Sequence, residues 1–232
     1  MKRILIVEDE VAIREFEAIN LKRVGYDTVE AGSGEEALEI FDNDIQGFDI
    51  ALLDVMMPGM DGFTLCKELR SRSNSLGIIM LTAKSQEMDK ISGLMIGADD
   101  YVTKPFSPTE LLARVDSLYR RVGASNSKAQ TTSELRLGEF ALDLRRRSLS
   151  KDGKEIELTQ VEFQIMEYFF QNPDTPISRR DILLKVWGDN YCGEEKIVDV
   201  NIRRLRMKIE NDPSNPKWIV TVWGKGYQWE SK

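Results

Sequence analysis

The chain has 232 residues, of which 41% are hydrophobic and 31% are charged, with a formal net charge of −7. This composition is typical of a folded globular protein and excludes general disorder. The length favours two domains of about 100–120 residues each. The apolar runs are only a few residues long, which excludes a membrane-spanning helix of roughly 20 residues.

The chain contains two cysteines, Cys66 and Cys192, and no histidine. Catalytic schemes that need a histidine base are therefore excluded, and a structural zinc site would lack ligands. Met1 to Arg3 lead directly into a short apolar run and then into acids, which is not the pattern of a signal peptide. We therefore expect a cytoplasmic protein without a disulfide framework.

The charge is distributed unevenly along the chain. Residues 1–122 carry 14 basic and 22 acidic residues, whereas residues 123–232 carry 18 and 17. The acidic first half is unsuited to binding nucleic acid. Any contact of the second half with DNA must come from local clustering of its basic residues.

Residues 1–121 alternate short apolar runs with helical patterns. The runs predict strands at 3–7, 26–30, 49–54, 77–82 and 100–103. The segments that follow them predict helices at 10–24, 34–44, 62–71, 86–96 and 107–121. Continuously apolar strands are typical of a parallel sheet covered on both faces, so we predict a doubly wound α/β domain of five βα units.

Residues 122–133 are small and polar, without apolar periodicity, and are predicted to form a flexible linker. The pattern then changes, and residues 134–232 are predicted to form a separate α+β domain. It contains a strand-like region, three helices and a closing hairpin, predicted at 134–158, 159–172, 178–187, 194–210 and 218–229. This order is typical of a winged helix-turn-helix domain, whose third helix enters the major groove of DNA.

Polar side chains lie at the carboxyl ends of four of the five strands predicted in the first domain. They are Glu8 with Asp9, then Asp54, Thr82 and Lys104. The carboxyl ends of parallel strands lie along one edge of a sheet, so we expect these side chains to share one pocket. Each residue alone has an ordinary structural explanation, such as helix capping; their common position is what favours a functional site.

Phosphoryl transfer to an aspartate would suit this set of residues. A carboxylate repels the phosphoryl group that it attacks, so a cation is needed between them, and Mg²⁺ prefers carboxylate oxygens and water. Lys104 supplies a further positive charge, and the Thr82 hydroxyl can donate a hydrogen bond. Positioning and charge neutralisation are most of what phosphoryl transfer requires, and Asp54 is a competent acceptor.

The motifs around these residues resemble the receiver domain of two-component response regulators. They are VEDE at 7–10, LLDVMMPGMDG at 52–62, LTA at 81–83 and GADDYVTKPF at 97–106. The resemblance implies that Asp54 is the phosphoacceptor and that Lys104, before a cis peptide to Pro105, binds the phosphate. It also implies Mg²⁺ ligands from Glu8, Asp9, Asp54 and the main-chain carbonyl of Met56, and a switch pair of Thr82 and Tyr101.

The third helix predicted in the second domain is strongly basic on part of its surface. A helical wheel through 194–210 places Val198, Ile202, Leu205 and Ile209 on one face, which should pack on the core. The opposite face then holds Lys196, Val200, Arg203, Arg204 and Met207, with Asn201, Arg206 and Lys208 at its flanks. A basic stripe on an isolated helix is usually only a solvated face, but the winged helix-turn-helix context favours DNA binding.

Residues 134–230 resemble the effector domain of the OmpR/PhoB family, through IVDVNIRRLR at 197–206 and TVWGKGY at 221–227. The resemblance implies a wing at 223–227 and a loop at 187–194 that contacts RNA polymerase. Some relatives carry arginine where this chain has Trp223, so Lys225 is the remaining basic wing residue. The implied DNA contacts are Lys196, Val200, Asn201, Arg203, Arg204, Arg206, Lys208 and Lys225.

The same resemblance implies a receiver homodimer held by ion pairs. Lys90 would pair with Glu110, and Asp100 with Arg114. Asp116 departs from the family, because relatives often carry a base there. A surface pair contributes only about 0–1 kcal/mol, so this loss need not prevent dimerisation.

We therefore predict a DNA-binding response regulator that accepts a phosphoryl group on Asp54 from a sensor histidine kinase. It would dimerise through its receiver, bind promoter DNA and regulate transcription. We expect no enzymatic activity apart from a part in its own phosphorylation and dephosphorylation. Two alternatives stay open: an aspartyl-phosphate phosphatase, which needs a second acid, and a constitutive DNA binder whose receiver serves only to dimerise.

Overall fold

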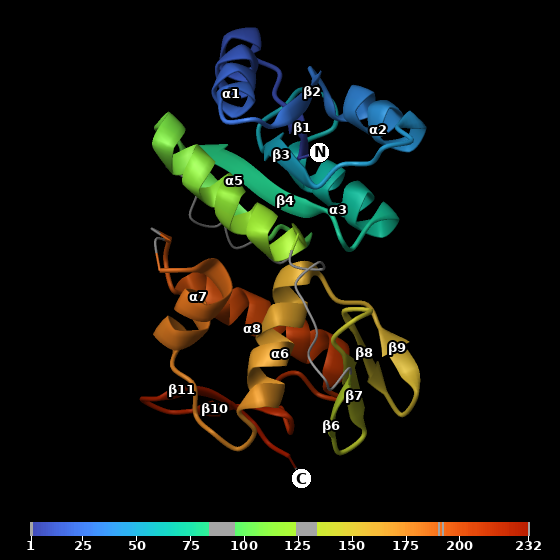
Figure 1. Ribbon diagram of the computed structural model, residues 1–232, viewed down its shortest axis with the longest axis vertical. Coiled ribbons are helices and arrows are strands. Elements are labelled where there is room, and N and C mark those ends of the chain that lie inside the picture. Colours follow the sequence, from blue (N-terminus) through green and yellow to red (C-terminus); the bar gives the residue numbers. More distant parts are fainter. Residues whose placement is uncertain (1, 84–95, 124–133, 190, 192, 232) are drawn as a thin grey trace. The chain divides into compact units, whose positions relative to one another are not determined.

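The structure is a computed structural model that describes residues 2–83, 96–123, 134–189, 191 and 193–231 (Figure 1). The chain divides into two compact units, Met1–Val122 and Gly123–Lys232. Most of the predicted helix at 86–96, with Lys90, and most of the predicted linker at 122–133 lie outside the described residues. None of the described helices combines the length and the apolar character needed to cross a membrane.

The first unit is built on a parallel sheet with strand order β2-β1-β3-β4-β5. The strands are β1 (Arg3–Val7), β2 (Asp27–Ala31), β3 (Ile50–Asp54), β4 (Gly77–Ala83) and β5 (Asp100–Lys104). The chain passes from β1 outward to β2 and then returns to place β3 on the other side of β1. The crevice beyond the carboxyl ends of β1 and β3 is therefore the switch point at which this type of sheet binds ligands.

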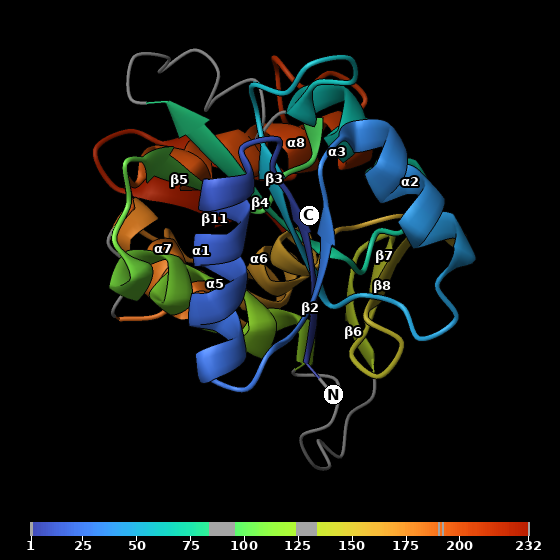
Figure 2. The same ribbon diagram turned by 90° about the horizontal axis from the view of Figure 1, so that it is seen from above.

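Two pairs of helices cover the sheet. In Figures 1 and 2, α1 (Val11–Arg23) and α5 (Pro108–Gly123) lie on one face, and α2 (Gly34–Asn43) and α3 (Gly62–Arg72) lie on the other. Leu21 of α1 and Val115 of α5 are fully buried against strand residues such as Ile6 and Leu52. The predicted α/β fold is confirmed, and the bounds of its described elements differ from the predicted ones by at most two residues.

The second unit begins with an antiparallel sheet in the order β6-β7-β8-β9. These strands are β6 (Glu134–Leu137), β7 (Phe140–Asp143), β8 (Ser148–Lys151) and β9 (Lys154–Ile156). Asp152 and Gly153 both have positive φ, 50° and 76°, which is typical of the tight turn that joins two antiparallel strands. Lys151 and Lys154 pair across this turn, which joins β8 to β9.

Three helices and a hairpin complete the second unit. They are α6 (Gln160–Gln171), α7 (Arg179–Trp187), α8 (Lys196–Ile209), β10 (Ile219–Val222) and β11 (Gly226–Trp229). Thr159 and Glu162 form a capping box at the start of α6, with each side chain accepting from the main-chain N–H of the other residue. The predicted winged helix-turn-helix arrangement is confirmed.

Candidate functional site

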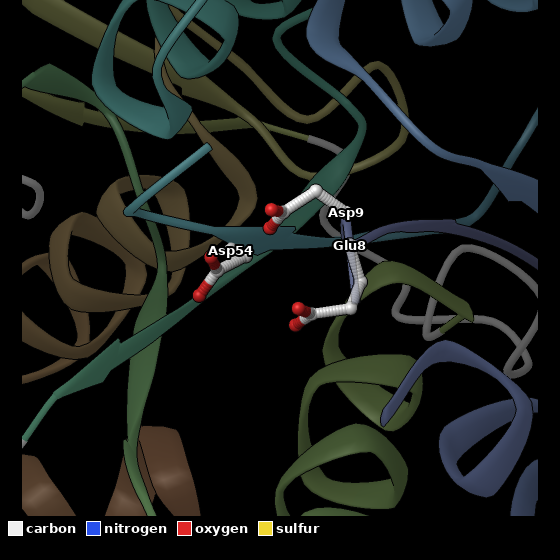
Figure 3. Close-up of side chains that lie close together, drawn as sticks. All are labelled: Glu8, Asp9 and Asp54. Atoms are coloured by element: carbon white, nitrogen blue, oxygen red, sulfur yellow. The ribbon is translucent and has the colours of Figure 1, made fainter. Parts of the chain in front are cut away.

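Three carboxylates meet at the carboxyl edge of the parallel sheet, at the crevice between β1 and β3. Glu8 and Asp9 directly follow β1, and Asp54 is the last residue of β3. One carboxylate oxygen of each lies within 4.8 Å of those of the other two, and Figure 3 shows the three side chains converging. Oxygen donors at this separation fit one Mg²⁺ ion. The structure thus brings together the three carboxylates predicted to share a site.

Lys104 places a positive charge between two of these carboxylates. Its Nζ lies 2.5 Å from Glu8 Oε2 and 2.7 Å from Asp54 Oδ1. Burial lowers the pKa of Lys104, but hydrogen bonds to Asp54 and Glu8 outweigh burial, so this pKa is raised and the amine stays protonated. Burial also raises the pKa of Glu8, although Lys104 opposes the rise. The Lys104–Pro105 peptide bond is cis, as the resemblance implies.

A cavity of about 430 Å³ opens beside the carboxylates and is lined by residues that include Asp9, Met56 and Phe63. The main-chain N–H of Met56 donates to Asp54 Oδ2 at 3.2 Å and helps to fix the carboxylate. Gly62 lets the first turn of α3 approach closely, because a Cβ there would lie 2.1 Å from the main-chain oxygen of Asp54. Asp54 is therefore supported by the main chain at Met56 and Gly62, and the cavity lies beside it at Asp9 and the next residue, Val55.

The two residues of the predicted switch pair lie on neighbouring strands. Thr82 is on β4 and Tyr101 is on β5, and both side chains are buried. The guanidinium of Arg114 lies 5.9 Å from the centre of the Tyr101 ring. The tyrosine ring is thus already turned inward here.

Three residues of the predicted dimer interface bind one another within a single chain. Arg114 Nη1 donates to Asp100 Oδ1 at 3.0 Å, and Arg114 Nη2 donates to Glu110 Oε1 at 3.1 Å. Asp116 is also engaged, because it accepts a hydrogen bond from the Tyr26 hydroxyl. Ion pairs between two copies would therefore have to replace pairs that already exist, and dimerisation stays a prediction.

Glu17 is a candidate for the functional site that was not predicted from the sequence. It lies on α1, is fully buried, and neither of its carboxylate oxygens has a hydrogen-bond partner in the described part of the chain. Burial raises its pKa to about 8, and the charge of Glu8 adds to this rise. Glu17 is consequently a neutral acid at pH 7, close enough to the pocket to feel its charges.

The predicted outer face of α8 is wrong for Val200 and Arg204, which are buried, and Asn201, predicted at the flank of this face, is buried as well. Asn201 Nδ2 donates to the main-chain oxygen of Ile197 at 2.8 Å, and Arg204 Nη2 lies 3.0 Å from Glu162 Oε1. The physical reason is that α8 packs against both α6 and α7 (Figure 1), so its buried arc is wider than the four apolar residues indicated. Direct base contacts by these three residues would require this packing to open.

The solvent-exposed side of α8 carries Lys196, Arg203, Met207 and Lys208. The ammonium of Lys208 is turned back toward the domain and binds Glu162 Oε2 at 2.7 Å. Arg206 is half-buried and also binds internally. Of the three arginines of α8 that the resemblance implies as DNA contacts, Arg203 is therefore the one that is exposed. Lys225 is exposed on the hairpin.

The closing hairpin is fastened to α8. Arg206 Nε donates to the main-chain oxygen of Ile219 at 2.8 Å, and its Nη2 donates to Thr221 Oγ1 at 2.9 Å. The Tyr227 hydroxyl donates to Asp199 Oδ1 at 2.7 Å. Burial raises the pKa of Tyr227 to about 12, and Asp199 adds to the rise, so this donor keeps its proton. The helix and the hairpin therefore form one connected surface.

Comparisons with known proteins agree with both units. Residues 4–116 match the family model of the response regulator receiver domain. Residues 153–229 match the model of the C-terminal domain of transcriptional regulatory proteins.

Similar proteins match the chain over nearly its whole length. The chain is 42% identical over 230 residues to the sensory transduction protein RegX3 of Mycolicibacterium smegmatis, covering 99% of this chain and 100% of that protein. It is 44% identical over 238 residues to the probable transcriptional regulator ycf27 of Cyanophora paradoxa, covering 99% and 97%. Among solved structures, the response regulator DrrB, a Thermotoga maritima OmpR/PhoB homologue, has a TM-score of 0.50 at 32% identity and 99% coverage of both chains.

The buried acid gives a prediction for the stability of the first unit. Glu17→Gln should stabilise it by roughly 3 kcal/mol at pH 7, because the folded protein holds a proton that the unfolded chain releases. The gain should disappear as the pH falls to the usual glutamate pKa of 4.5 and level off above about 8. Hydrogen exchange of β1 and β3 amides across this pH range measures this gain in stability. Glu15→Gln on the exposed side of α1 is the matched control, and parallel pH curves for both variants would contradict the assignment.

The buried ion pair predicts the role of Arg204. Arg204→Ala should destabilise the second unit by about 3–5 kcal/mol, because Glu162 would lose a partner inside the domain. All four tryptophans lie in this unit, so tryptophan fluorescence during urea unfolding of the full chain reports on it selectively. Arg203→Ala, one residue earlier but exposed, should change stability by less than about 0.5 kcal/mol. Equal effects of the two substitutions would show that Arg204 is not a core residue.

Proposed function

Because the chain belongs to the OmpR/PhoB family of two-component response regulators, we propose that a sensor histidine kinase phosphorylates Asp54 in a Mg²⁺-dependent reaction. Phosphorylation would promote dimerisation of the receiver and binding to promoter DNA. The observation that carries this proposal is the juxtaposition of Glu8, Asp9 and Asp54 with Lys104 at the switch point of the sheet. RNA polymerase would be contacted through residues 187–194.

The residues of the pocket have complementary parts in this reaction. Glu8, Asp9, Asp54 and the main-chain carbonyl of Met56 would hold Mg²⁺, which supplies charge neutralisation between the carboxylates and the phosphoryl oxygens. A carboxylate oxygen of Asp54 forms the new bond to phosphorus while the bond from phosphorus to the imidazole nitrogen of the kinase breaks. The leaving imidazole keeps the electron pair of that bond and takes a proton from solvent.

Lys104 and Thr82 would bind the phosphoryl group once it is attached to Asp54. Before phosphorylation, the Lys104 ammonium binds Asp54 and Glu8. Once Asp54 carries a phosphoryl group, its oxygens offer a greater negative charge, and Lys104 would move to them. The Thr82 hydroxyl would donate to another phosphoryl oxygen, and Tyr101 would be held inward behind it. Through these movements, phosphorylation of Asp54 would affect the surface formed by β5 and α5.

We also propose that the chain is a phosphoacceptor and has no substrate of its own. A phosphatase of the aspartyl-phosphate class needs a second acid that protonates a leaving group. The two other carboxylates of the pocket, Glu8 and Asp9, would be taken up as metal ligands. Glu17 has a raised pKa but is fully buried and is not among the residues that line the cavity.

The first test concerns the acceptor. Asp54→Asn should abolish phosphorylation by acetyl phosphate with Mg²⁺, because the nucleophilic oxygen is replaced by an amide nitrogen. Intact-mass spectrometry and a phosphate-affinity gel measure the modified fraction. Asp42→Asn, on the exposed last turn of α2, should leave phosphorylation unchanged. Labelling of the Asp54→Asn variant at the wild-type level would refute the proposal, and equal DNA affinity with and without phosphodonor would favour a constitutive binder.

The second test concerns DNA reading by α8. Arg203→Ala should reduce discrimination between specific and random duplexes by about 1–3 kcal/mol, because an exposed arginine can bind a base edge with two hydrogen bonds. Lys196→Ala, also on the exposed side of α8, should instead weaken binding to all sequences. It should also lower the number of counterions released on binding by about one. Fluorescence anisotropy at several salt concentrations separates these effects. Unchanged discrimination in the Arg203→Ala variant would falsify the groove assignment.

A further inference from the structure

One tryptophan of this chain is exposed, while the others are packed. Trp187 and Trp229 are 1% and 0% exposed, and Trp218 stacks on Trp229 with ring centres 5.8 Å apart. Trp223 is 91% exposed, at the tip of the closing hairpin. Removing an indole from water on binding is favourable, and a fully solvated one is therefore a ready contact for a partner.

The hairpin presents Trp223 on a defined turn. Val222 pairs with Gly226, so Trp223, Gly224 and Lys225 form the turn between the two strands. The Lys225 main-chain N–H donates to the Val222 oxygen at 2.9 Å, and Gly224 has a φ of +74°, which favours glycine. The side chain therefore projects from a short, closed turn.

The turn is also fixed relative to α8. Arg206 joins the helix to Ile219 and Thr221 on one strand, and Asp199 joins it to Tyr227 on the other. A further bridge pairs Tyr227 with Ile177, ahead of α7. A partner that spans α8 and the hairpin would consequently meet Trp223 at a set distance from the helix, with little ordering of the hairpin required on binding.

The charges around the tip select an anionic partner. The segment from Lys217 to Trp229 contains two lysines and no acidic residue, and Lys225 is exposed two positions after Trp223. An aromatic ring beside an exposed ammonium suits a surface that offers both phosphates and stacked aromatic faces. Double-stranded DNA carries phosphates along its surface and presents base faces where a step is unstacked. Arg203 on α8 adds a further exposed positive charge on the same unit.

We propose that Trp223 is an aromatic wedge that enters the minor groove and inserts partly between two base pairs. The proposal rests on the function proposed above, in which α8 occupies the major groove, because the hairpin beside it then meets the neighbouring minor groove. Apolar side chains inserted there unstack a base step and kink the duplex. Lys225 would bind a flanking phosphate.

This wedge adds specificity that the major-groove contacts do not supply. Pyrimidine–purine steps such as TA and CA unstack most easily, so the protein should favour one of these steps at a fixed distance from the bases read by α8. The preference would come from how easily the step is deformed and not from hydrogen bonds to base edges, because the indole makes one hydrogen bond at most.

The test uses the full-length chain with Mg²⁺ and acetyl phosphate, and a duplex that the wild type selects from a randomised library. Trp223→Ala should weaken binding roughly 5- to 100-fold, the range expected for loss of one aromatic stacking contact. It should also reduce DNA bending, measured by energy transfer between the duplex ends, and abolish the fluorescence increase of 2-aminopurine at the wedged step. Trp223→Phe should keep most of the bend. Lys225→Ala is the matched control on the same turn, with weaker binding but an unchanged bend.

The outcomes separate the wedge from the function on which it rests. Equal affinity and bend for Trp223→Ala and wild type, with loss of discrimination in Arg203→Ala, would overturn the wedge alone. Failure of the wild type to select any duplex would overturn both. If DNA binding is unchanged but Trp223→Ala no longer sediments with anionic phospholipid vesicles, the residue belongs to a membrane contact and the wedge is wrong. Because Trp223 is exposed, an unchanged melting temperature is expected for every variant of the turn.

Discussion

The position of Lys104 between Glu8 and Asp54 is the interaction on which the first unit depends. A parallel sheet with this strand order brings carboxylates from β1 and β3 into one crevice, where their mutual repulsion is unfavourable. Lys104 comes from β5 and reaches past β4 to both of them, at 2.5 and 2.7 Å. One ammonium compensates only part of the charge of three carboxylates. The pocket could therefore hold a further cation, and the proposed transfer of an anionic phosphoryl group to Asp54 would require one.

The strand that carries Lys104 is held at its other end by two buried arginines. Arg70 of α3 binds Asp99 at 2.5 Å, and Arg114 of α5 binds Asp100 at 3.0 Å. The two helices lie on opposite faces of the sheet, so β5 is fixed from both sides at its start and by Lys104 at its end. Buried ion pairs contribute less to stability than to defined geometry, because desolvation offsets much of their attraction. A displacement of Lys104 would therefore be transmitted along β5, because the strand has little other freedom to move.

The sequence predicted the pocket better than the DNA-reading face, and the reason is physical. Strand ends follow from apolar runs, and the topology of a parallel sheet then determines which side chains meet, so Asp54 and Lys104 could be placed from the chain alone. The exposed side of α8 depends on how many neighbours it has. Four apolar residues indicated one contact face, whereas packing against two helices also buries Asn201 and Arg204. Glu17 was missed although a signal exists: it lies four residues from both Ile13 and Leu21, on the stripe that faces the core.

The second unit contains its own DNA-reading surface, and this limits what phosphorylation has to do. Arg206 and Asp199 connect α8 to the hairpin without any residue of the receiver, so this surface needs no phosphoryl group to form. Arg114 likewise already has Asp100 and Glu110 as partners within one chain, and an exchange of these ion pairs between copies gains little energy in itself. Under the proposed function, control by Asp54 would then come from how often two copies are held together. Two weakly binding surfaces joined in a dimer bind adjacent sites far more tightly than one, which converts a small change in association into a large change in occupancy.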